Sequence, residues 1–114
     1  MNSFIEEKKL DIIIEQGFDF VMAMTLYDLN NNPINLNGST IEAQMRQFPE
    51  ATDFFPFEVF HNGLGGRITI KMPHTLTKEI SFSSGVYNVI VNFINGTRVN
   101  LIFGDVTIIP EGTR

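Results

Sequence analysis

The sequence predicts an all-β protein, a sandwich of about seven or eight antiparallel strands. Apolar residues recur at every second position in several segments, which is typical of strands that bury one face. Turn-forming residues separate these segments at intervals of roughly 8–12 residues. The helical segments that a βαβ fold needs do not occur between them. The 114 residues fit a single sandwich domain over 1–114, with 1–8 as a charged lead-in.

The clearest element is a long hairpin that closes the chain, predicted over residues 85–110. Its first arm alternates apolar and polar residues from Tyr87 onward. Asn95 and Gly96 follow, the pair best suited to a two-residue hairpin turn because both turn positions need a positive φ. The second arm alternates until Gly104, where the shift in alternation predicts a β-bulge or a bend. Val99, Leu101 and Phe103 are expected on one face of this arm. If Val106 and Ile108 share that face, a bulge lies at Gly104; if they do not, the arm crosses between the sheets there.

The earlier strands are shorter, and turn signals bound each of them. They are expected over 10–14, 18–27, 40–48, 54–61 and 67–72. The segment 18–27 leaves an amphipathic helix as the alternative, because its Met and Ala residues also tolerate a helix. Pro56 cannot donate to a ladder, so the segment 54–61 is expected to be an edge strand or an irregular one. Residues 73–84 have no strand period, and a single helical turn near 75–78 is expected to carry the chain between the sheets.

The aromatic run around Pro56 supplies the candidate binding residues. Phe55 and Phe57 are expected to fill the core, since they alternate. Phe54 and Phe60 then remain for the surface, where exposed aromatic side chains mark interfaces. The candidate interface consists of Phe54, Phe60, His61 and Asn62.

Composition excludes several classes of function. The net charge is −5, and only eight Lys and Arg residues are scattered along the chain, which argues against nucleic-acid binding. There is no cysteine, so disulfides and thiolate metal sites are excluded. No apolar run approaches the roughly 20 residues that span a bilayer, and the first ten residues lack the apolar core of a signal peptide. We therefore expect a protein made in a cytoplasm, with neither nucleic acid nor membrane as a partner.

The sequence motifs that would indicate a metal-binding or catalytic site are incomplete. Asp28 begins a run that resembles a calcium loop, but Pro33 and Ser39 stand where that loop needs glycine and glutamate. His61 and His74 lack the spacing of zinc ligands, and they are interpreted as surface residues. No GxSxG nucleophile elbow occurs, and the carboxylates fall on the predicted wet faces or in turns. We therefore expect no catalytic residues, no metal and no cofactor, and a protein that is not an enzyme.

In their order along the chain, several short motifs resemble a family of small structural and accessory proteins of tailed bacteriophages. The match spans nearly the whole chain, from about residue 10 to residue 114. The motifs are Gln16-Gly17-Phe18, the turn DLNNNPINLNG at 28–38, Gln44-Met45-Arg46, GRITI at 66–70, Gly85-Val86-Tyr87, Asn95-Gly96, and the ending from Gly104-Asp105-Val106 through Pro110 to Thr113-Arg114.

The resemblance implies an immunoglobulin-like β-sandwich in the virion, associated with the tail, the baseplate or the neck. It implies a non-enzymatic structural or assembly protein that binds other virion proteins. A homo-oligomer is a further expectation, because edge strands can pair between subunits. Two alternatives stay open. One is a module that binds a carbohydrate or another small ligand for host attachment, through Phe54, Phe60, His61 and Asn62. The other is a phage effector whose acidic surface binds a host protein.

Overall fold

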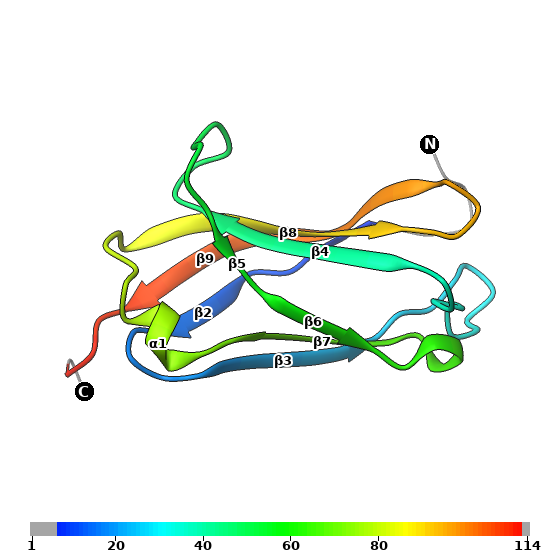
Figure 1. Ribbon diagram of the computed structural model, residues 1–114, viewed down its shortest axis with the longest axis horizontal. Helices are drawn as coiled ribbons and strands as arrows, with labels where there is room; N and C mark the ends of the chain where they lie inside the picture. The colour runs from blue at the N-terminus through cyan, green and yellow to red at the C-terminus, as the bar shows by residue number, and fades with distance from the viewer. Residues whose placement is uncertain (1–6, 113–114) are drawn as a thin grey trace.

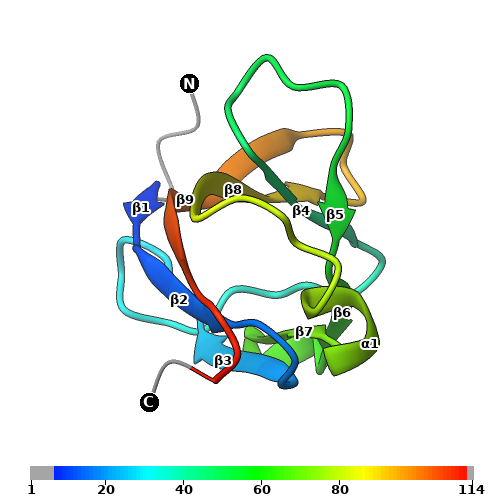
Figure 2. The same cartoon turned by 90° about the vertical axis from the view of Figure 1, so that its left-hand side faces the viewer.

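The computed structural model describes residues 7–112, and most of the expected lead-in over 1–8 lies outside them. Two β-sheets face each other across one hydrophobic core, which confirms the predicted all-β sandwich (Figures 1 and 2). The larger sheet, called sheet A below, has six strands, and the smaller, called sheet B, has three.

The strands of each sheet come from distant parts of the chain. Sheet A contains β1 (Lys8–Lys9), β2 (Ile12–Glu15), β4 (Thr40–Arg46), β5 (Phe55–Pro56), β8 (Ser84–Asn92) and β9 (Arg98–Ile109). Sheet B contains β3 (Phe20–Thr25), β6 (Glu58–His61) and β7 (Arg67–Met72). A short 3-10 helix, η1 (Gly63–Gly65), precedes β7, and one helical turn, α1 (His74–Thr77), follows it. The segment 18–27 is therefore a strand and not a helix.

The strand order is that of an immunoglobulin-like sandwich. Sheet B runs β3–β7–β6, as strands B, E and D do, and β4, β8 and β9 take the places of C, F and G in sheet A. One departure from the expected antiparallel arrangement lies at the N-terminal end, where β1 and β2 both pair parallel to β9. This pairing ties the first described strands to the last one.

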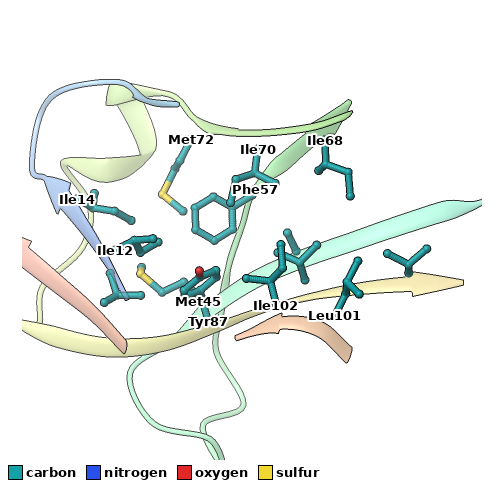
Figure 3. Close-up of a cluster of buried hydrophobic side chains, with 14 of the residues drawn as sticks. Ile12, Ile14, Met45, Phe57, Ile68, Ile70, Met72, Tyr87, Leu101 and Ile102 are labelled. Atoms are coloured by element: carbon teal, nitrogen blue, oxygen red, sulfur yellow. The ribbon is translucent and has the colours of Figure 1, made fainter. Parts of the chain in front are cut away.

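One extended segment, residues 55–61, leaves one sheet and joins the other. Its first part, β5, pairs with β4, and its second part, β6, pairs with β7. Phe57 lies between the two parts, where its N–H donates to the carbonyl of Ala43 at 2.9 Å. Its ring fills the middle of the core, 6.3 Å from the ring of Tyr87 on β8 (Figure 3). The expectation that Phe57 is a core residue is confirmed, and Phe55 is half-buried against Phe82.

The bulge in the closing hairpin lies at Leu101, and the prediction of a bulge at Gly104 is wrong. Val89 pairs with Ile102 whereas Ile90 pairs with Asn100, so Leu101 is the extra residue of β9. Both Leu101 and Ile102 are buried. Because the alternation shifts at this point, Phe103 lies on the outer face and not with Val99 and Leu101 in the core.

The turn of this hairpin is longer than the predicted two-residue turn. The loop covers residues 93–97, and the N–H of Phe93 donates to the carbonyl of Thr97 at 2.8 Å. Gly96 has a φ of 93°, but Asn95 has no positive φ. The side-chain oxygen of Asn95 instead accepts the N–H of Thr97 at 2.9 Å, which closes the loop.

Gly104 allows the N-terminal segment to approach β9 very closely. A Cβ atom at this position would lie 2.2 Å from the carbonyl oxygen of Leu10. That oxygen accepts a hydrogen bond from the hydroxyl of Tyr87 at 2.6 Å. The carboxylate of Asp11 accepts the N–H of Asp105 at 2.9 Å. These contacts bridge the gap between β1 and β2, where the ladder with β9 is interrupted.

Burial and the nearby charge of Asp11 raise the pKa of Tyr87 from 10.0 to about 12. The unfolded chain releases this proton near the ordinary value, while the folded protein holds it. The stability from this group is therefore fully present below pH 10 and is lost as the pH rises through the folded value. The expected loss of unfolding free energy over this window is roughly 2–3 kcal/mol.

This titration can be measured directly, because the chain has only two tyrosines. The variant Tyr27→Phe leaves Tyr87 as the single tyrosine, and its absorbance at 295 nm is expected to rise with a midpoint close to pH 12. Repeating the titration in urea, with the chain unfolded, supplies the control. A midpoint near pH 10 in the folded variant would contradict the buried environment of the hydroxyl.

Candidate functional site

The structure places the four candidate interface residues in two separate regions. Phe54 and Phe60 are both exposed, at 45% and 55%. They are six positions apart along nearly extended chain, which corresponds to roughly 20 Å. Phe54 precedes β5 at the edge of sheet A, whereas Phe60 lies on the outer face of sheet B. They do not form one aromatic platform, and their role in binding remains a prediction.

His61 and Asn62 close the turn between β6 and β7. The ring nitrogen Nδ1 of His61 accepts the N–H of Gly63 at 3.2 Å. The side-chain oxygen of Asn62 accepts the N–H of Arg67 at 3.0 Å. These bonds satisfy backbone donors at the strand ends, so both residues shape the turn that follows Phe60.

Phe54 belongs to a loop that stands above sheet A, between β4 and β5 (Figure 1). Arg46 braces this loop from the sheet. Its guanidinium donates to the carbonyl of Ala51 at 2.6 Å and to the side-chain oxygen of Gln44 at 2.8 Å. It also lies over the Phe54 ring, 5.0 Å from the centroid. The exposed ring is therefore held in place by a cation from the neighbouring strand.

The outer face of sheet A carries a depression of about 350 Å³, called the outer-face depression below. Aligned residues of neighbouring strands form its floor, because Gln44 lies opposite Asn88, and Asn88 lies opposite Phe103. Lys9 continues this row on β1. Pro49, in the loop that Arg46 braces, forms one of its walls. Sequence reasoning missed this site, because Phe103 was expected in the core.

Beside the depression, three polar side chains on the same face bond to one another. The carboxylate of Glu42 accepts from Arg98 at 2.8 Å and from the amide of Asn92 at 2.9 Å. Arg98 also donates to the side-chain oxygen of Asn92. The Asn92 amide and then Arg98 hold the pKa of Glu42 below its usual range. This closed network belongs to the hairpin end of sheet A.

A second feature that the sequence did not reveal is the edge of sheet B at β3. Strand β3 ends the sheet order, pairs with β7, and has no second neighbour among residues 7–112. None of its six residues, FVMAMT, is charged or proline. Val21 of this strand is 58% exposed, and Phe18, in the turn that precedes the strand, is 54% exposed. Natural edge strands are normally protected by charge, proline, a bulge or a covering segment.

The polar clusters outside these regions serve local structure. Asp28 accepts the N–H groups of Asn30 and Asn32, at 2.8 and 3.0 Å, and so forms a turn, as its sequence predicts. Asp19 accepts both the backbone N–H of His74 and a bond from its ring, and these bonds lower the pKa of the Asp19 carboxyl. Within residues 7–112, no three His, Asp or Glu side chains gather in a way that could hold a metal ion. The same part of the chain contains no helix with the length and apolar character to cross a membrane.

Comparisons with known proteins do not assign the chain to a family. No family model matches it, and no curated protein does. Among solved structures, an internalin-like protein of Listeria monocytogenes is similar, with a TM-score of 0.34 and 21% sequence identity. The similarity covers 89% of this chain but 27% of that protein.

Proposed function

We propose that this protein is a non-enzymatic structural or assembly module of a tailed-phage particle, which binds other virion proteins. The single observation that carries the binding role is the unprotected edge of β3. Its backbone offers a row of hydrogen-bonding groups, and the neighbouring apolar side chains are exposed. Strand addition at such an edge is a common way for one protein to recruit an extended segment of another. The phage setting rests on the ordered sequence motifs.

The partner that fits this edge is an extended segment with alternating apolar side chains. Val21 and Ala23 point to the outer face of sheet B, beside Lys71 and Thr69 of β7. An added strand would extend this face, and its main chain would supply the affinity while side chains such as that of Val21 select its sequence. A second copy of this chain could present β3 in the same way, which would give a symmetric dimer.

The particle role is tested by mass spectrometry of purified particles of the phage that encodes the chain. The protein is expected among the virion proteins at a fixed ratio to its partner. Its absence from intact particles, with detection in the infected-cell lysate, would contradict the proposal. Recovery of one host protein with the chain from that lysate would favour the effector alternative.

Lysine substitutions on β3 test whether this strand is the binding edge. The double variant Val21→Lys, Ala23→Lys is expected to keep its fold, because both side chains are exposed, and to lose incorporation into particles. The matched control is Ile13→Lys, which places a lysine on an exposed position of β2, the edge strand of the other sheet. Equal incorporation of the double variant and the wild type would rule out β3 as the binding edge.

A further inference from the structure

We infer that the outer-face depression of sheet A binds a neutral saccharide. Phe103 would support the face of a sugar ring, and the amides of Asn88 and Asn100 would bond its hydroxyl groups. This inference is independent of the β3 edge, which lies on the other sheet. It rests on the bulge in β9, on two amides that make no hydrogen bond to other side chains, on the pairing of the nearby cations and on the braced loop beside the depression.

The bulge at Leu101 creates the floor of the site. In a regular strand, residues three positions apart face opposite sides, so Asn100 and Phe103 would be separated. Because β9 contains the extra residue, both lie on the outer face, with Asn100 opposite Ile90 and Phe103 opposite Asn88. Bulges are frequent beside binding sites, since they re-aim side chains in this way.

The amides at the floor have hydrogen-bonding capacity to spare. No side-chain hydrogen bond involves Asn88 or Asn100 within residues 7–112, in contrast to the closed network of Glu42, Asn92 and Arg98 on the same face. An amide side chain carries two donors and one acceptor oxygen. A sugar hydroxyl both donates and accepts, so adjacent hydroxyls match a pair of amides. The half-buried ring of Phe103, which lines the same depression as both amides, offers an apolar surface.

The charges around the depression favour a neutral ligand. Lys9 lies 3.2 Å from the carboxylate of Asp11 and 3.8 Å from that of Asp105. The guanidinium of Arg46 is already engaged by the carbonyl of Ala51 and by Gln44. Lys9 is therefore paired with carboxylates, and Arg46 already donates to two neutral acceptors, whereas an anion site needs donors that are free to approach the ligand. The Asp105 carboxylate remains an acceptor for a hydroxyl group.

The loop between β4 and β5 contributes to the lining of the depression. Pro49 of this loop lines it, and Arg46 fixes the loop to β4 through the bonds described above. The volume of about 350 Å³ falls within the range of small-ligand pockets, roughly 300–1,000 Å³. Since the loop is held before any ligand binds, little ordering is required on binding.

The test uses the full chain, first on an array of neutral and anionic glycans and then in an NMR titration with a neutral trisaccharide that the array identifies. The side-chain amide signals of Asn88 and Asn100 are expected to shift together. Phe103→Ala is expected to weaken binding at least tenfold, and Asn100→Ala severalfold. Tyr27→Ala, which removes an exposed ring far along the chain from the depression, is the matched control and is expected to bind as wild type does.

Three results would overturn the inference. The first is that no neutral glycan on the array binds, and the second is that only anionic glycans bind. The third is binding that survives both Phe103→Ala and Asn100→Ala. Thermal unfolding of each variant shows whether it is folded, and Asn100→Ala guards against a loss of structure because its side chain is exposed. The charged β3 variant is expected to lose incorporation into particles but to bind the saccharide as the wild type does.

Discussion

Gly104→Ala is expected to destabilise the protein by about 3 kcal/mol or more, because its methyl group would collide with main-chain atoms. The added Cβ would lie 2.2 Å from the oxygen and 2.7 Å from the carbon of the Leu10 carbonyl. Backbone cannot move aside as a flexible side chain can. The segment around Leu10 would have to leave β9, which would also break the bonds from Tyr87 to Leu10 and from Asp105 to Asp11.

Urea unfolding followed by circular dichroism measures this effect. Thr107→Ala, at an exposed position of the same strand, is the control and is expected to change the free energy of unfolding by about 0.5 kcal/mol or less. If Gly104→Ala unfolded at the wild-type urea concentration, the close approach of Leu10 to β9 would be disproved.

The second large effect is expected at Thr77, which joins α1 to the turn between β2 and β3. Its side chain is fully buried, and its hydroxyl accepts the N–H of Gly17 at 3.0 Å and donates to the carbonyl of Phe18 at 2.9 Å. Thr77→Val keeps the shape but leaves both backbone groups without this partner. The expected loss of unfolding free energy is about 1–3 kcal/mol.

Thr75→Val is the matched control, because Thr75 lies exposed in the same helical turn. Hydrogen exchange adds a local measure, since the amide of Gly17 is expected to exchange faster in Thr77→Val than in the control. Unchanged exchange at Gly17, with unchanged stability, would show that the hydroxyl does not hold this turn.

Local patterns predicted the strands well where one face is apolar and the other polar. Residues 67–72 form β7 with the predicted bounds, and Ile68, Ile70 and Met72 are its buried side chains. The bulge could not be located in this way, because Leu101, Ile102 and Phe103 are all apolar and fit either face. Its position depends on pairing with β8, which a single strand does not encode.

The candidate sites were less predictable for the same reason. The exposure of Phe54 and Phe60 followed from alternation, but their separation depends on the crossing of residues 55–61 between the sheets. In the sequence, Asn88 and Asn100 resemble any polar residue on the solvent-facing side of a strand. Only the register of β8 and β9 brings them beside Phe103.

The parallel pairing of β2 with β9 has a mechanical consequence. Ile12 pairs with Val106 and Glu15 with Ile109, so the chain enters this ladder at one end of the pair and leaves it at the other. A force that pulled the two ends of the protein apart would load the inter-strand hydrogen bonds in shear, all of them together. Strands that peel apart lose their bonds one at a time and separate at a lower force. The β2–β9 pair is therefore expected to resist tension applied through the start of β2 and the end of β9.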